Sequence, residues 1–241
     1  MRELFIHPNT EKLAQAATDL ITEVAEDATA TRGEFHLALS GGSTPRPVYS
    51  LLAREPFRDK IVWEKVHLWW GDERYVPPDH LDSNYYMAYE TLISQVPIPE
   101  SHVHRIPAEL PPDQAAQAYE AALKQQFPGE QFPCLDLILL GMGEDGHTTS
   151  LFPHTVALAE SKRWVVANFV EKPAAWRVTM TVSLINAARQ VAVLVSGTDK
   201  AGMLKHVLQG PYLPESLPIQ MIQPTPGRLL WLLDAPAAAE L

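Results

Sequence analysis

Residues 136–153 read DLILLGMGEDGHTTSLFP, and the fold of the chain can be inferred outward from them. The first part of this stretch is apolar except for Asp136, and its length fits a buried strand of a parallel sheet. Three glycines then break the pattern and place Asp145 and His147 just beyond the strand. In an open α/β sheet, ligands bind outside the carboxyl ends of the strands. The stretch therefore predicts a strand that ends in a functional turn.

The same pattern of a short apolar strand, a turn and a helix recurs on both sides of this stretch. Alternating strands and helices with glycine turns predict an α/β fold: a doubly wound, mostly parallel, Rossmann-like sheet with helices on both faces. No internal repeat or domain boundary is visible, so residues 1–241 are expected to form a single domain. The expected strands are 3–7, 35–39, 62–70, 135–140, 164–170, 178–184, 191–195, 219–222 and 228–233, with an edge strand near 103–106.

The composition is that of a globular protein and argues against some partners. The chain has 241 residues, of which 46% are hydrophobic, and a formal net charge of −10. Nucleic-acid-binding proteins usually carry a basic face, so we expect no nucleic-acid partner. The first residues lack the apolar core of a signal peptide, and no stretch approaches the ~18 apolar residues of a membrane span. We therefore expect a cytoplasmic protein without membrane contact.

Residues 40–45 read SGGSTP and follow the strand expected at 35–39. Thr44 suits a helix N-cap and Pro45 suits the first helical position. A glycine turn at a helix N-terminus offers unpaired N–H groups and the positive end of the helix dipole, which suits a phosphate. Because prolines lack the N–H, Gly41, Gly42, Ser43 and Thr44 would supply most of the binding. A tight strand-to-helix turn without a ligand remains an alternative.

Residues 71–74, GDER, directly follow the strand expected at 62–70. They place Asp72 and Arg74 at the carboxyl edge of the sheet. A solvated turn is the alternative interpretation of these charges. Residues 75–83 are expected to form a loop that is able to fold over a cleft.

Cysteine and histidine give no sign of a metal centre. Cys134 is the single cysteine, which excludes an intrachain disulfide, and its apolar neighbours favour a buried, inert thiol over a nucleophile. His102 and His104 form a pair, but no further cluster of ligands lies at supporting spacing, so we reject a metal site and expect no metal and no cofactor. The other histidines without a motif are expected to be structural or surface residues: His7, His36, His67, His80, His154 and His206.

Four patches together resemble one family. They are SGGSTP at 40–45, GDER at 71–74 with Ser83-Asn84 beyond it, GMGEDGHTTSLFP at 141–153, and SGTDK at 196–200. Their order and approximate spacing resemble those of the 6-phosphogluconolactonases over nearly the whole chain. This family belongs to a wider group with a Rossmann-like parallel sheet that includes glucosamine-6-phosphate deaminase. Each patch alone is weak, whereas the set of four is specific.

The resemblance implies hydrolysis of 6-phospho-D-glucono-1,5-lactone to 6-phospho-D-gluconate in the oxidative pentose phosphate pathway, without a cofactor. The small-molecule partner would be the sugar-phosphate lactone. The resemblance also implies Arg74 and Lys200 as cationic partners of the phosphate, with Arg177 at a further family position. In the deaminases a glutamate follows the histidine five positions later; here that position is Phe152, which favours the lactonase. A sugar-phosphate isomerase or deaminase is the nearest alternative, and a catalytically silent sugar-phosphate sensor is an alternative of another class.

The residues can carry lactone hydrolysis by general-base activation of water. A neutral imidazole near pH 7 can take a proton from the attacking water, so His147 is the candidate base. Asp145 is a candidate for orienting the imidazole, and Asp72 is a second candidate for assisting the base or binding a sugar hydroxyl. Backbone N–H groups near residues 143–146 are candidate donors to the oxyanion. We expect a monomer or a weak homo-oligomer.

Overall fold

A computed structural model describes residues 2–171, 174–225 and 227–241. Its centre is a six-stranded sheet in which every neighbouring pair is parallel. The middle strands are buried along nearly their whole length, which explains why their sequences are mostly apolar. In spatial order the strands are β1 (Arg2–His7), β9 (Arg228–Asp234), β8 (Gln190–Val195), β5 (Leu137–Gly141), β2 (Phe35–Leu39) and β3 (Val66–Trp70).

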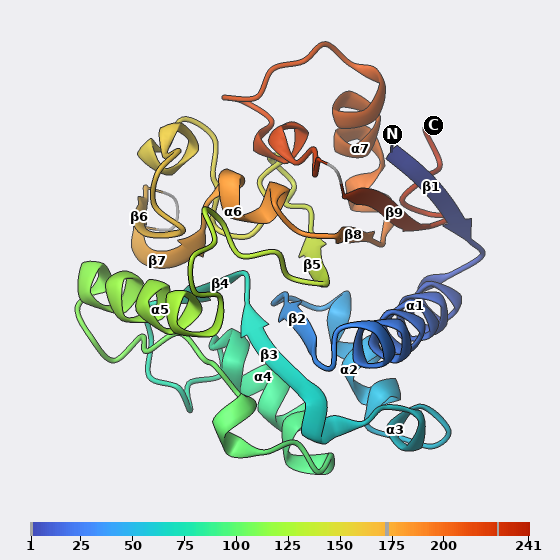
Figure 1. Cartoon of the computed structure of the whole chain (residues 1–241). Helices are drawn as coiled ribbons and strands as arrows, with labels where there is room; N and C mark the ends of the chain where they lie inside the picture. The colour runs from blue at the N-terminus through green and yellow to red at the C-terminus, as the bar shows by residue number, and fades with distance from the viewer. Residues whose placement is uncertain (1, 172–173, 226) are drawn as a thin grey trace.

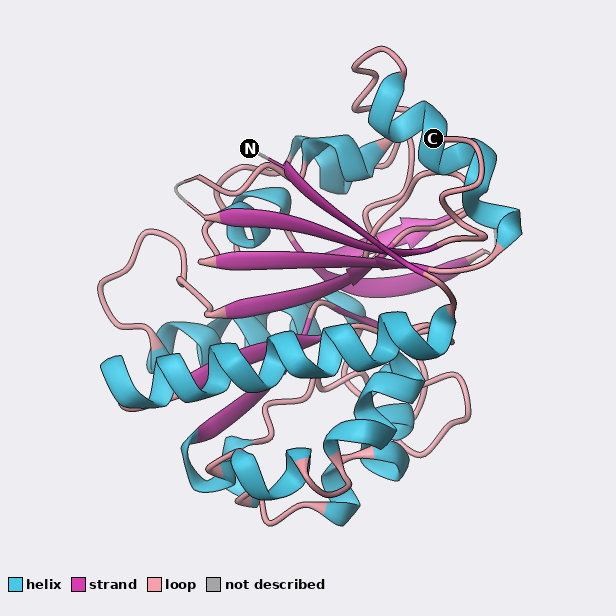
Figure 2. Cartoon of the chain, turned by 90° about the vertical axis from the view of Figure 1, so that its right-hand side faces the viewer, coloured by secondary structure: helices cyan, strands magenta, loops and turns pink. Residues whose placement is uncertain are grey.

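Helices cover both sides of this sheet (Figure 2). The long helix α1 (Thr10–Thr31) runs along one side, and α7 (Ala201–Gln209) lies on the opposite side (Figure 1). The predicted doubly wound α/β architecture is therefore confirmed. The other α-helices are α2 (Pro45–Leu52), α3 (Phe57–Lys60), α4 (Asn84–Thr91), α5 (Pro112–Gln126) and α6 (Val182–Asn186); short 3₁₀ helices cover Trp63–Lys65, Ile93–Gln95, Glu100–His102, Val156–Ala159, Thr198–Lys200 and Pro218–Met221.

A second, three-stranded antiparallel sheet departs from the sequence prediction. It consists of β4 (Asp72–Arg74), β7 (Ala175–Met180) and β6 (Val165–Val170) in that order. The strand expected at 178–184 ends at Met180, because the Thr181 hydroxyl accepts a hydrogen bond from Leu184 N–H and so caps α6. The strand expected at 219–222 is a 3₁₀ helix that begins at Pro218, whose ring fixes φ and removes a ladder donor.

The segment expected to form an edge strand near 103–106 makes only a single bridge to β3. Val103 pairs with Leu68, and His104 N–H donates to the Leu68 carbonyl at 2.9 Å. Cys134, expected to be buried, is partly exposed. Its partial burial still raises the pKa of the Cys134 thiol, which disfavours the reactive thiolate.

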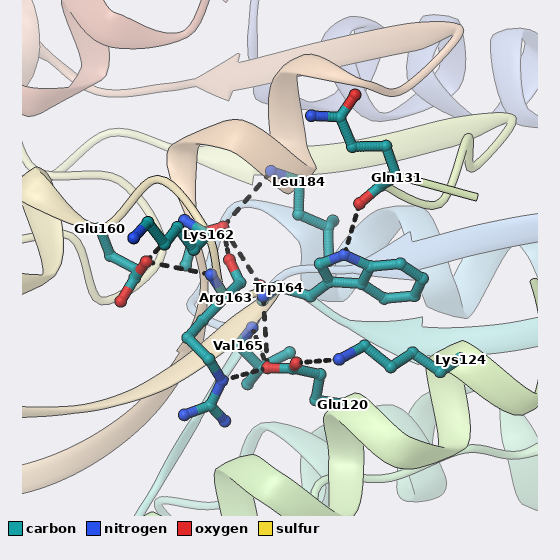
Figure 3. A network of polar contacts seen from close by, with 10 residues as sticks. Glu120, Lys124, Gln131, Glu160, Lys162, Arg163, Trp164, Val165 and Leu184 are labelled. Carbon is teal, nitrogen blue, oxygen red and sulfur yellow. Dashed lines mark hydrogen bonds and ion pairs between the residues drawn. The ribbon is translucent and has the colours of Figure 1, made fainter. Parts of the chain in front are cut away.

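The antiparallel sheet is attached to α5 through a buried carboxylate, Glu120 (Figure 3). Its two oxygens accept from Lys124 Nζ at 2.5 Å and from Arg163 Nε at 2.7 Å, and the second oxygen also accepts from the N–H of Trp164 at 3.3 Å. Burial alone would raise the pKa of Glu120, but the hydrogen bonds from Lys124 and Arg163 bring it below its usual value. This ionised carboxylate fixes the start of β6 and, through the sheet, the position of β7.

Four histidines lie together at the amino ends of β2 and β3. His36 and His67 are direct neighbours across the two strands, with ring centroids 4.8 Å apart. His102 stacks on His67 at 4.0 Å, and His104 Nε2 lies 3.0 Å from His67 Nδ1. Within the described ranges, no three histidine, cysteine, aspartate or glutamate side chains are arranged to hold a metal ion. The proximity of these rings, which we call the histidine stack, was not predicted from the sequence.

The carboxyl ends of β8, β5, β2 and β3 lie next to one another because these four strands are neighbours in the sheet. The segment after each strand therefore reaches the same edge. These segments carry the four sequence patches: 196–200, 141–147, 40–44 and 71–74. In the last of them only Gly71 follows β3, and Asp72–Arg74 forms the strand β4 and not a turn.

Candidate active site

One pocket of about 650 Å³ opens at this carboxyl edge. It brings together every residue that the sequence and the resemblance singled out for catalysis or binding. Those residues are His147, Asp145, Asp72, Gly41, Gly42, Ser43, Thr44, Arg74, Arg177 and Lys200.

His147 and Asp145 form a close pair at the pocket wall. The imidazole Nδ1 lies 2.5 Å from Asp145 Oδ1, which also accepts from the His147 N–H at 3.1 Å. A carboxylate only accepts hydrogen bonds, so Nδ1 carries the proton and Nε2 keeps a lone pair in the neutral ring. Burial alone would raise the pKa of Asp145, but the hydrogen bond and charge of His147 bring it below its usual value. In the neutral ring Nε2 is therefore the nitrogen that is able to accept a proton.

Two neighbours confine the imidazole. A Cβ built at Gly143 would lie 2.1 Å from His147 Nδ1, so only glycine leaves room for the ring beside Asp145. On its other side the ring stacks on Phe152, with centroids 4.0 Å apart and an interplanar angle of 23°. Phe152 lines the pocket as well. The aromatic side chain five positions after His147 therefore packs against the candidate base.

The turn at residues 41–44 enters α2 at the pocket. Pro45 occupies the first turn of the helix as predicted, and the first amides of a helix have no intrahelical acceptor. Thr44 occupies the N-cap position as predicted, but its hydroxyl makes no cap hydrogen bond and instead lies 3.0 Å from Ser196 Oγ. This contact connects the turns after β2 and β8.

Three cations line the same pocket. Arg74 and Arg177 stand directly opposite each other across β4 and β7. Burial, followed by the charge of Arg74, lowers the pKa of Arg177. Arg177 Nε is buried and has no hydrogen-bond acceptor among the residues that the structure describes. Lys200 Nζ completes the set, 3.8 Å from Glu144 and 3.7 Å from Asp199. Like charges placed opposite each other repel, and a bound anion would relieve that repulsion.

Asp72 lines the pocket, and both of its carboxylate oxygens accept hydrogen bonds from the protein. Ser150 Oγ donates to Asp72 Oδ2 at 2.5 Å, and Asn84 Nδ2 donates to Oδ1 at 3.3 Å. The sequence indicates no role for Ser150 and includes Asn84 only as part of a motif. Because Asp72 and Ser150 are 78 positions apart in the chain, no local spacing predicts their contact.

The proposed oxyanion donors are partly occupied. Gly143 N–H donates to the His147 carbonyl at 2.8 Å, and Gly146 N–H donates to the Gly143 carbonyl at 3.2 Å. These two amides hold the turn together and are not available to a substrate in this arrangement. The expectation of an oxyanion site therefore fails for both glycines.

The fold and the pocket define an α/β protein with three cationic side chains and a histidine–aspartate pair at the carboxyl edge of a parallel sheet. Comparison with known proteins is specific. The chain belongs to the family described as glucosamine-6-phosphate isomerases/6-phosphogluconolactonase, whose model matches residues 8–231. A curated 6-phosphogluconolactonase from Synechocystis sp. is 45% identical over 237 residues, which is 97% of this chain and 95% of that protein.

Solved structures agree with this assignment. The 6-phosphogluconolactonase from Trypanosoma brucei is 30% identical and superposes with a TM-score of 0.88, covering 100% of this chain and 99% of that chain. A monomeric glucosamine-6-phosphate deaminase superposes with a TM-score of 0.83 at 19% identity, covering 99% of this chain and 100% of that chain. The second likeness shows the shared fold alone. Among the described residues, no helix has the length and apolar character needed to cross a membrane.

Proposed function

We propose that the chain is a 6-phosphogluconolactonase, which hydrolyses 6-phospho-D-glucono-1,5-lactone to 6-phospho-D-gluconate in the oxidative pentose phosphate pathway. One observation carries this proposal: a single pocket holds three cations, a phosphate-binding type of turn and a histidine–aspartate pair. The cations match the phosphate of the substrate, and the pair matches the hydrolysis of an ester. The names of the relatives support the same activity.

The phosphate group of the substrate is the main group that the pocket binds. The amides of residues 41–44 and the side chains of Arg74, Arg177 and Lys200 hold the phosphate dianion. Charge-assisted hydrogen bonds to phosphate are stronger than neutral ones, so this end of the pocket supplies most of the affinity. Binding energy gained there orients the lactone carbonyl toward His147.

Hydrolysis proceeds by general-base activation of water. His147 Nε2 takes a proton from water as the water oxygen attacks the lactone carbonyl, and Asp145 stabilises the imidazolium that forms. The ring C–O bond then breaks, and the imidazolium returns the proton to the departing ring oxygen. The product is the open-chain carboxylic acid with its phosphate unchanged.

The test is the decay of fresh 6-phosphogluconolactone, generated in situ, with and without protein. Unphosphorylated gluconolactone is the control for the anion site. We expect a far larger acceleration over the spontaneous rate for the phosphorylated lactone than for the unphosphorylated one. No acceleration, together with ammonia release from glucosamine 6-phosphate, would instead establish a deaminase. The single domain, the cytoplasmic location, the absence of nucleic-acid binding and a monomeric or weakly oligomeric state stay predictions.

A further inference from the structure

Asn84, the first residue of α4, contacts two segments that form the pocket, the turn after β2 and the strand β4. The residue is 2% exposed and lines the pocket. Its Nδ2 donates to the Asp72 carbonyl at 2.9 Å and to Asp72 Oδ1 at 3.3 Å. Its Oδ1 lies over Gly41, where an added Cβ would be 1.9 Å away. The side chain therefore fills the space between the phosphate turn after β2 and the start of β4.

Glu73 holds Asn84 in place through hydrogen bonds to the first turn of α4. This carboxylate is 2% exposed and accepts from the N–H groups of Asn84, Tyr85 and Arg74, each at 2.8 Å. Ser83 Oγ donates to it as well, at 3.0 Å. A carboxylate at a helix N-terminus satisfies unpaired amides and interacts favourably with the helix dipole. The first turn of α4, and with it Asn84, is thereby held to β4.

Asp72 extends the contact to the loop that carries the candidate base. Its Oδ1 accepts from Asn84 and its Oδ2 from Ser150 Oγ at 2.5 Å. Ser150 lies three residues after His147, and its carbonyl accepts from Asn168 Nδ2 at 2.8 Å. Both carboxylate oxygens of Asp72 therefore bind protein donors, which suits a structural bridge between the two loops.

We propose that Asn84 is a positioning residue for the lactonase reaction, which sets the phosphate turn at Gly41 relative to the His147 loop through Asp72 and Ser150. This inference rests on the proposed function. Displacing a bound substrate from its reacting group by about 1 Å can cost about 100-fold in rate. Loss of Asn84 should therefore lower kcat/KM for the phosphorylated lactone, because phosphate binding no longer orients the lactone carbonyl correctly toward His147. This effect adds to any effect on folding.

A double-mutant cycle tests the contact between Asn84 and Gly41. Gly41→Ala places a methyl group against the amide of Asn84, and we expect kcat/KM for 6-phosphogluconolactone to fall about 100-fold. Asn84→Ala removes the bridge and should cost about 10-fold. In the double variant the methyl group introduced at position 41 occupies space vacated by the amide, so activity should return to the level of Asn84→Ala alone. Coupled residues deviate from additivity in this way.

Two further measurements separate positioning from a merely structural role. In Asn84→Ala the ratio of kcat/KM for the phosphorylated lactone to kcat/KM for the unphosphorylated lactone should fall. In Asn84→Asp this ratio should fall at least as far, because the new carboxylate cannot donate a hydrogen bond and faces the carboxylate of Asp72. Glu90→Ala, at an exposed position of the same helix, should leave the ratio unchanged. Effects of Gly41→Ala and Asn84→Ala that simply multiply, or an unchanged substrate ratio, would overturn the inference.

The same cycle is read from 6-phosphogluconate binding by calorimetry, which requires no turnover. A wild-type protein that hydrolyses the lactone but shows additive effects would refute the role of Asn84 and leave the proposed function intact. A wild-type protein without lactonase activity would refute the proposed function. The binding cycle would then still show whether Asn84 and Gly41 are coupled. Rescue of binding in the double variant is the result that supports the inference.

Discussion

The histidine stack predicts that the folded chain loses stability in mild acid. Burial, followed by the charges of neighbouring histidines, lowers the pKa of His36 to about 3 and that of His104 to about 4. Burial also lowers the pKa of His67. Glu34 is the nearby carboxylate, 3.4 Å from His36 Nε2 and 3.8 Å from His67 Nε2. Because it is half exposed, it stabilises a protonated ring only weakly.

Asp136 is the second carboxylate beside the stack, but its charge is already engaged. Its Oδ2 accepts from the backbone N–H of His36 at 2.9 Å, and its Oδ1 accepts from Arg32 Nε at 2.9 Å. Arg189 Nε lies 3.5 Å from the same oxygen. Protonating the stack therefore adds positive charge to a region that holds little free negative charge.

The sign of the effect follows from proton binding. A histidine in the unfolded chain titrates near pH 6.5, whereas His36 and His104 stay neutral in the folded chain until much lower pH. Between these values the unfolded state binds more protons, so stability falls as the pH falls. From pH 7 to pH 5 the buried ring of His36 accounts for about 2 kcal/mol. His104 is partly exposed, so solvent screening reduces its share to about 1 kcal/mol, and the two together give about 3 kcal/mol.

The assay is urea unfolding followed by tryptophan fluorescence at pH 7 and pH 5. The wild-type protein should lose about 3 kcal/mol of unfolding free energy between the two conditions, and His36→Gln should lose about 2 kcal/mol less. Domains are typically stable by about 5–15 kcal/mol, so a loss of this size is easily measured. His206→Gln, which removes an imidazole from an exposed position, is the matched control and should behave as the wild type. Equal losses in the wild type and in His36→Gln would show that burial of this ring does not cause the acid sensitivity.

Three further predictions concern the pocket and its support. Asp145→Asn removes the charge of the half-exposed carboxylate beside His147, and kcat should fall about 10–30-fold with KM little changed. Arg74→Ala and Lys200→Ala should each raise KM for the phosphorylated lactone about 10–100-fold and leave gluconolactone hydrolysis unaffected, and an unchanged KM in both would exclude their phosphate role. Glu120→Gln should lower the unfolding free energy by about 2 kcal/mol at pH 7 relative to the wild type. This difference should shrink below about pH 4.5, because the carboxylate of the wild-type protein also becomes protonated there. A difference that stays constant with pH would contradict the ionised state of Glu120.

The parallel sheet and the position of the site were predictable because both depend on local patterns. Short runs such as 135–140, which is apolar except for Asp136, identify buried strands, and the glycine turns that follow them identify the carboxyl edge. Once the strands are parallel neighbours, the four turns have to meet. The sequence could therefore place His147 and the 41–44 turn in one pocket without any contact being known.

The rest depends on contacts between residues far apart in the chain. The pairing of β4 with β7, which brings Arg74 opposite Arg177, is a long-range register that no local pattern encodes. The occupation of Asp72 by Ser150 and Asn84 has the same origin. The strand expected at 219–222 failed for a different reason, since its apolar residues are compatible with a short helix and Pro218 decides between the two.

The role of His147 as the base is best judged from the kcat of His147→Ala with 6-phosphogluconolactone, with His154→Ala as the matched histidine control. Positioned general-base catalysis is worth about 10²–10⁴-fold, so His147→Ala should lose at least about 100-fold in kcat while it retains the wild-type unfolding midpoint. His154→Ala should retain its activity, because that side chain does not line the pocket. A kcat for His147→Ala within about threefold of wild type would show that the base lies elsewhere and that the proposed mechanism is wrong.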